Sequence, residues 1–340
     1  MQPIEETTQR AVFHAMEEIR PRSSSPPTPA FITTRLERDI LKVLLYFDIF
    51  NHPLKAEELY SFLPSNSTSP SDILRACQSH PLKTIVSCRE SYIFMKSAGE
   101  SCIDERLRKE QLAARRWRIA GIMTKLIERF PFVRGVFVSG ELSKGLASKH
   151  GDIHFVVVTR EHRLWICRTL LILFKKTLLL NSKKYFCVNH FVAERHLGVA
   201  SRNLYSATEV ATLKALGNSD SFHKYTEANA WVAGYFPNLR WGADTTPTPG
   251  ARASVLQKLI ELAIPDKIGD RLDAWLMSRW MKLWNWRYAH LDKEKRSRLF
   301  RCSRFLSTAY GEDFQSKILS GYFLRLKQFG IEVDDAAATN

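Results

Sequence analysis

Residues 138–159 read VSGELSKGLASKHGDIHFVVVT, and this stretch decides the expected fold. A β-prone run ends at a turn containing Gly140, a polar loop follows, and a second β-prone run opens with Asp152. Side chains alternate along a strand, so Asp152 and His154 are expected on one face about 7 Å apart. The small residue at Gly140 lets backbone N–H groups approach an anion, and Lys144 adds positive charge. The stretch therefore predicts a site for phosphate or metal where two strands meet.

The segments around this stretch alternate between β-prone and helical patterns. The predicted strands are 135–140, 152–159 and 184–193, and the predicted helices are 102–130 and 162–180. Such alternation implies a domain in which helices cover a sheet. The chain after residue 203 is expected to be helical.

The N-terminal third has a different pattern, with three short helices followed by a hairpin. The helices are expected at 34–47, 55–63 and 71–78, and the hairpin strands at 84–88 and 91–95. This order predicts a winged-helix arrangement. Its third helix carries one cation and one acid, so a structural or protein-contact role is at least as well supported as DNA binding.

The glycine turn and the acidic strand resemble the active-site signature of the DNA polymerase β-type nucleotidyltransferase superfamily. In that superfamily a Gly-Ser turn precedes two aspartates that are one residue apart. Further segments look like a bacterial family of nucleotidyltransferase-like proteins with an N-terminal winged-helix segment, and the resemblance covers residues 35–240. These segments are YFDIFNHPL (46–54), VRGVFVSG (133–140), RLWICRTLLILFKK (163–176), KKYFCVN (183–189) and ANAWVAGYFPN (228–238).

The resemblance implies a role for each residue of the motif. The turn formed by Ser139, Gly140, Glu141 and Lys144 would bind the triphosphate of an NTP. Residues 152 and 154 would hold Mg²⁺ or Mn²⁺, which activates an acceptor hydroxyl and neutralises the leaving phosphate. The implied reaction moves a nucleoside monophosphate from the NTP to an acceptor that the sequence does not identify.

This chain departs from the family pattern at two positions. Glu141 stands where the turn should carry Ser, and His154 stands where the second Asp should be. Imidazole is a poor ligand for Mg²⁺, and a carboxylate at position 141 repels a triphosphate. The third carboxylate of the fold is also missing, since the strand at 184–193 offers Asn189 or His190 at its centre and Glu194 lies beyond it. The sequence thus predicts weak or lost catalysis.

Two alternatives remain open at this motif. Glu141 could lie beside Asp152 and restore a two-carboxylate site for Mg²⁺ or Mn²⁺. The spacing of His150, Asp152 and His154 could also suit a transition metal, but His150 is expected in the loop before the strand, which makes a dedicated zinc site the less favoured reading.

Composition limits the partners and the compartment. Fifty Lys and Arg against 35 Asp and Glu give a formal charge of +15, which favours nucleotides, nucleic acids or acidic headgroups. Six scattered cysteines without metal-ligand spacing indicate a reducing, cytoplasmic location. The most apolar stretch, 164–180, contains Arg168, Lys175 and Lys176, so no membrane insertion is expected.

Aromatic and basic residues interleave at 275–288, which reads WLMSRWMKLWNWRY. Such a pattern can stack bases and bind phosphates. Because Leu276, Trp280, Leu283 and Trp284 share one helical face, a buried packing stripe is the favoured interpretation.

The expected fold class is α+β, with a mixed sheet in its core. The predicted organisation is a disordered tail at 1–33, a winged-helix-like domain at 34–100, a nucleotidyltransferase-like core at 101–203, a helical region at 204–330 that includes a linker at 242–251, and a polar tail at 331–340. The predicted function is that of a nucleotidyltransferase-like protein with a degenerate metal site. The alternative is a non-catalytic regulatory protein that binds nucleic acid or protein.

Overall fold

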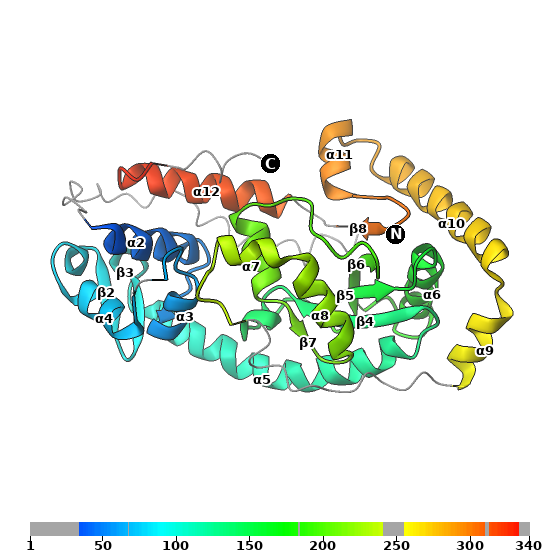
Figure 1. Ribbon diagram of the computed structural model, residues 1–340, viewed down its shortest axis with the longest axis horizontal. Helices are drawn as coiled ribbons and strands as arrows, with labels where there is room; N and C mark the ends of the chain where they lie inside the picture. The colour runs from blue at the N-terminus through cyan, green and yellow to red at the C-terminus, as the bar shows by residue number, and fades with distance from the viewer. Residues whose placement is uncertain (1–33, 67, 183, 241–254, 310–312, 333–340) are drawn as a thin grey trace.

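The protein has a mixed α+β fold, with one large mixed sheet and a largely helical C-terminal part (Figure 1). The computed structural model describes residues 34–66, 68–182, 184–240, 255–309 and 313–332. The predicted tail at 1–33, the predicted linker at 242–251 and most of the predicted tail at 331–340 lie outside the described residues. Among the described residues, no helix combines the length and the apolar character needed to cross a membrane.

The N-terminal unit contains the predicted three helices and hairpin, together with one further short strand. Thr34 begins the first helix with a capping box, because its side chain accepts from the backbone N–H of Glu37 and the Glu37 carboxylate accepts from the backbone N–H of Thr34. The strands form a sheet in the order β1-β3-β2. The elements are α2 (Arg35–Asp48), β1 (Leu54–Lys55), α3 (Ala56–Ser61), α4 (Pro70–Gln78), β2 (Val86–Arg89) and β3 (Tyr92–Met95).

The long helix α5 (Ser101–Glu128) joins this unit to the central sheet. Its Arg106 is buried, donates to the Glu58 carboxylate on α3 and to the backbone carbonyl of Pro53, and pairs with Glu110 at 2.9 Å. A buried guanidinium with several acceptors is a well-satisfied charge. Arg106 therefore fixes the N-terminal unit against the start of α5.

The central sheet has five strands in the order β7-β4-β5-β6-β8. Strands β5 and β6 are parallel and all other neighbours are antiparallel, so the sheet is mixed as expected. Strands β7 and β8 come from the part of the chain that was expected to be helical. The strands are β4 (Val133–Ser139), β5 (His154–Thr159), β6 (Cys187–Ala193), β7 (Lys214–Ala215) and β8 (Leu306–Thr308).

Both faces of this sheet are buried under helices. Ile153, Phe155 and Val157 pack into the cluster with α5 and α6, whereas Val156 and Val158 pack into the cluster with α7 and α8. Alternate residues of β5 therefore pack into two different cores on opposite faces of the sheet. This explains why the sequence of β5 is almost continuously apolar. The remaining helices are α6 (Leu164–Thr177), α7 (Leu204–Ala211), α8 (Ser219–Ala228), α9 (Val255–Ala263), α10 (Asp266–Arg287), α11 (Lys293–Leu299) and α12 (Phe314–Gln328).

The C-terminal helix α12 packs on the N-terminal unit. Its Ile318, Tyr322 and Leu326 join the core of the N-terminal unit, and Figure 1 shows α12 beside α2. Arg325 pairs with Asp48 of α2 at 3.2 Å. The two ends of the described chain are thus packed together. Single turns of 3₁₀ helix occur at Leu82–Thr84, Lys96–Ala98 and Leu142–Lys144, and a longer one at Ala230–Gly234.

Candidate functional site

The glycine turn follows β4, where the sequence places it. Gly140 has φ +75°, and a Cβ atom built on it would lie 3.2 Å from Cδ2 of His154. Ser143 Oγ donates to the Gly140 carbonyl at 2.9 Å and closes the turn. Both the backbone conformation and the close approach of the imidazole therefore favour glycine at this position.

Lys144 does not extend freely into the turn. Its ammonium lies 2.7 Å from the Glu209 carboxylate on α7 and 3.3 Å from the Gly140 carbonyl. The predicted phosphate-binding cation is therefore paired inside the protein. Binding a phosphate through Lys144 would require breaking or sharing this ion pair.

Glu141 lies at the entrance of the loop that leads to β5. Its carboxylate accepts from the backbone N–H of Ser148 at 3.0 Å and from the Ser148 hydroxyl at 2.7 Å. A Cβ on Gly151 would meet a Glu141 carboxylate oxygen at 3.0 Å, so this carboxylate lies one residue from Asp152. The Glu141 carboxylate therefore lies beside the backbone of Gly151, the residue before Asp152.

Asp152 lies in the loop, because β5 begins at His154, two residues later than predicted. The ladder between β4 and β5 ends at the pair Ser139 and His154, since Gly140 then turns the chain away. Arg116 of α5, which is buried, donates to the carbonyls of Gly151 and Lys149 and holds this loop. Asp152 is half-buried immediately before the strand rather than on it.

His154 lies at the centre of the group. It faces Cys187 across the parallel pair β5 and β6 and is hydrogen-bonded to the Cys187 thiol. Burial lowers the pKa of His154, but Cys187, Asp152 and Glu141 together outweigh burial and raise the pKa to about 9. His154 therefore lies among acidic groups and beside the Cys187 sulfur.

The centre of β6 carries no carboxylate. Asn189 is the extra residue of a bulge opposite β5, and its side-chain amide donates to Cys187 Sγ at 3.0 Å. His190 is half-buried, and burial together with nearby Arg301 lowers its pKa to about 4. Glu194 lies beyond the strand, where it accepts from the backbone N–H of Glu161 at 3.3 Å. These positions agree with the sequence interpretation of this strand.

The side chains around Asp152 determine whether the site can hold a metal ion. Within the part of the chain that the structure describes, no three side chains of His, Cys, Asp or Glu are grouped so that they could hold a metal ion. His150 lies exposed in the loop, as expected. Mg²⁺ and Mn²⁺ favour oxygen ligands, and the position between Asp152 and Gly140 holds an imidazole instead. The donor set therefore does not fit a pair of such ions.

Three contacts of the site were not predicted. Cys187 lies beside His154, Arg116 holds the loop, and Glu209 neutralises Lys144. Cys187 could have been found from the register of the two predicted strands, because parallel neighbours place it opposite residue 154. Arg116 and Glu209 come from helices distant in sequence, and no local pattern indicates them.

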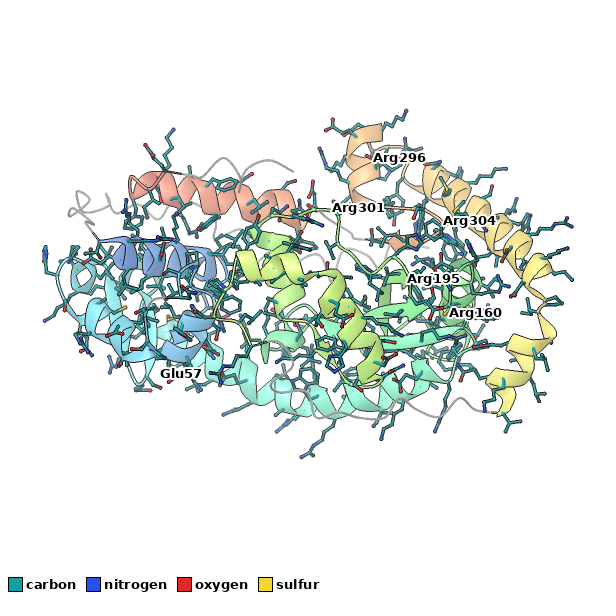
Figure 2. The ribbon with its side chains drawn as sticks, in the orientation of Figure 1. Glu57, Arg160, Arg195, Arg296, Arg301 and Arg304 are labelled. Carbon is teal, nitrogen blue, oxygen red and sulfur yellow. The ribbon has the colours of Figure 1, made fainter. Side chains whose placement is uncertain are left out.

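A group of arginines lies at the β8 side of the sheet. Arg160 follows β5 and Arg195 follows β6, while Arg301 and Arg304 precede β8. Figure 2 shows these four residues in the half of the molecule that contains β8 and α10. Arg160 pairs with Asp266 at 3.0 Å, and Arg195 and Arg301 are exposed. By contrast, α4 offers only Arg75, which lies 3.6 Å from Asp72.

Comparisons with protein-family models, with curated proteins and with solved structures found no match.

Proposed function

We propose that the chain is a nucleotidyltransferase-fold protein in which transfer of a nucleoside monophosphate is weak or lost. The arrangement of β4, the glycine turn and β5 supports the proposed fold, because the end of β4 lies in register with the start of β5. Gly140 and Asp152 thereby come to the same edge of the sheet. The three helices and the small sheet of the N-terminal unit support its winged-helix-like character.

The observation that carries the proposal is the position of His154. Its ring lies against Gly140, where the backbone would approach a phosphate, and it bonds to Cys187 of the next strand. The imidazole thus occupies the place of the second carboxylate and supplies no oxygen ligand. The pairing of Lys144 with Glu209 supports loss of nucleotide binding independently.

The experiment incubates the purified full-length chain with each of the four labelled NTPs, in Mg²⁺ and then in Mn²⁺. We expect little or no transfer of label to the protein or to added acceptors. Strong transfer that disappears in Asp152→Ala would show that the site is active and would overturn the proposal. Asp104→Ala, a change of an exposed carboxylate on α5, serves as the matched control.

A second candidate function rests on the arginine group. Exposed arginines near one end of a sheet can bind the phosphates of a nucleic acid, and such binding weakens steeply with salt. Gel shifts with single- and double-stranded DNA and RNA at rising salt test this candidate. Arg195→Glu with Arg301→Glu should abolish a shift, and Arg38→Glu on α2 should not. No shift at low salt would remove this function.

A further inference from the structure

Helix α9 contacts the protein through its polar side. The Gln257 amide donates to the Phe130 carbonyl at 3.1 Å, and Gln257 is buried. The Glu261 carboxylate accepts from the backbone N–H of Phe132 at 2.6 Å and pairs with Arg134 at 2.8 Å. The inward side of this helix is therefore held by hydrogen bonds and an ion pair.

The outward side of α9 is largely apolar and carries one cation, Lys258. Val255, Leu259 and Leu262 are all exposed, and Leu262 has 81% of its surface accessible. A helix on the surface of a globular protein normally turns its apolar side to the core and its polar side to water. Among the described residues, nothing covers the apolar outer side of α9, and an exposed apolar surface of this kind is typical of an interaction site.

Helix α10 has two aromatic sides. Leu276, Trp280 and Trp284 pack with the central core, and Trp280 Nε1 donates to Thr169 Oγ1 on α6 at 2.9 Å. These three residues confirm the predicted packing stripe, whereas Leu283, the fourth, is exposed. The opposite side of α10 is exposed and also carries aromatic and aliphatic side chains, which is unusual for a surface helix.

The exposed face of α10 extends along the helix. Trp275 and Trp286 lie eleven positions apart, close to three turns, so they share one side. Their accessible fractions are 57% and 77%. The other large exposed apolar residues of this helix are Ile268, Leu272, Met281 and Leu283. In Figure 1, α9 and α10 follow one another along the outer edge of the molecule, and α6 lies between α10 and the sheet.

The exposed face of α10 is also basic. Between Arg271 and Arg287 the sequence contains a single acid, Asp273, which is fully buried against the N-terminus of α6. Arg271, Arg279, Lys282 and Arg287 are exposed, and the Arg279 guanidinium lies 5.9 Å from the ring of Trp275. The face therefore combines aliphatic side chains, two tryptophans and positive charge.

We propose that the outer faces of α9 and α10 dock on the surface of an anionic lipid membrane, without crossing it. Helices that lie in a membrane interface carry aliphatic and Trp side chains on one side and Lys and Arg beside them. Tryptophan favours the headgroup region, and the cations match acidic headgroups. The charge of +15 adds to this attraction.

The same observations disfavour two other occupants. Bases stack on aromatic rings, but Val255, Leu259, Leu262 and Ile268 offer no ring, so much of the face would stay unused by a nucleic acid. A second copy of the chain would place exposed arginines and lysines of α10 against their own equivalents, with no exposed acid between Arg271 and Arg287 to neutralise them. A lipid surface satisfies both the apolar and the basic residues.

The test is sedimentation of the full-length chain with vesicles of phosphatidylcholine alone and of phosphatidylcholine with phosphatidylglycerol. We expect binding to the anionic vesicles that is weakened by salt, and much weaker binding to the neutral ones. Trp275→Ser with Trp286→Ser should reduce the binding by about tenfold or more. Ile122→Ser with Leu324→Ser, which removes exposed apolar residues of α5 and α12, should leave the binding unchanged.

A charge variant provides the second arm and guards against misfolding of the tryptophan variant. Arg279→Glu with Lys282→Glu should lower binding to anionic vesicles and leave thermal unfolding unchanged. Absence of vesicle binding by the unaltered chain would overturn the proposal. Vesicle binding that neither variant reduces would also overturn it. A dimer or an RNA complex that only the tryptophan variant loses would overturn it as well.

Discussion

Gly140 and Gly145 adopt nearly the same left-handed backbone, with φ +75° and +76°, but differ in their surroundings. A Cβ on Gly140 would approach His154, whereas nothing lies within 4 Å of the corresponding position on Gly145. Gly145→Ala should therefore cost about 1 kcal/mol of unfolding free energy from backbone strain alone. Gly140→Ala should cost about 2 kcal/mol or more, because the ring must also move.

Urea unfolding of both variants measures the difference. Adding His154→Ala to Gly140→Ala should recover the excess cost and leave the backbone part. Equal losses in the two glycine variants would mean that the imidazole does not press on the turn.

His52 is a half-buried histidine near Glu58 of the N-terminal unit and Arg106 of α5. Burial, followed by the positive charge of Arg106, lowers its pKa to about 3, although Glu58 opposes the shift and Lys109 and Lys144 assist it. The unfolded chain takes up a proton near pH 6.5, and the folded chain takes it up only near pH 3. The contribution of neutral His52 to stability is therefore complete above about pH 6.5 and is lost as the pH falls towards 3.

His52→Gln should flatten this dependence. Between pH 7 and pH 5, we expect the unaltered chain to lose about 2 kcal/mol more unfolding free energy than the variant. Urea unfolding at the two pH values gives this quantity, and His223→Gln on the exposed side of α8 is the control. A variant with the same pH slope as the unaltered chain would contradict the assignment.

The sequence predicts the positions of the motif residues, but it does not predict which distant side chains contact them. Gly140 forms the predicted turn, and the Glu141 carboxylate lies beside Gly151. Lys144 was predicted to face phosphate, but Glu209 binds it from 65 positions away. Pairing across such separations depends on tertiary packing, which a local pattern does not encode.

At the level of elements, Asp273 of α10 caps α6. Its carboxylate oxygen accepts from the backbone N–H groups of Trp165 and Ile166 at 2.7 and 3.0 Å. The side chain is fully buried, and burial raises its pKa despite these hydrogen bonds. The cap of one helix is thus supplied by another helix about a hundred residues later.

Asp273→Ala should leave these two N–H groups without an acceptor and cost about 2–3 kcal/mol of unfolding free energy. Asp273→Asn retains one oxygen and should cost less. Thermal unfolding ranks the two variants against the unaltered chain, and equal stability of Asp273→Ala would refute the capping role.

Long elements were predicted better than short ones. The periodic patterns located α2, α5 and α6 to within a few residues, because each carries several turns of signal. Strands β7 and β8 have two and three residues, and their pairing with β4 and β6 is decided by those neighbours. The start of β5 was misplaced because Asp152 belongs to a loop held by Arg116.

At the scale of the whole molecule, segments distant in sequence complete each core. The N-terminal core takes Tyr322 and Leu326 from α12, and the central core takes Trp284 from α10. The sequence pattern alone assigns both segments to a separate helical region at 204–330. Hydrophobic periodicity predicts which face of a helix is buried. It does not predict which other helix or strand packs against that face.

The most direct measurement of the central claim is a titration with Mn²⁺ and ATP, followed by thermal unfolding. Ligand that binds the folded chain raises its unfolding temperature. We predict no shift for the unaltered chain, and a shift that needs both Mn²⁺ and ATP for His154→Asp with Glu141→Ser. A Mn²⁺-dependent shift of the unaltered chain that Asp152→Ala abolishes would contradict the account.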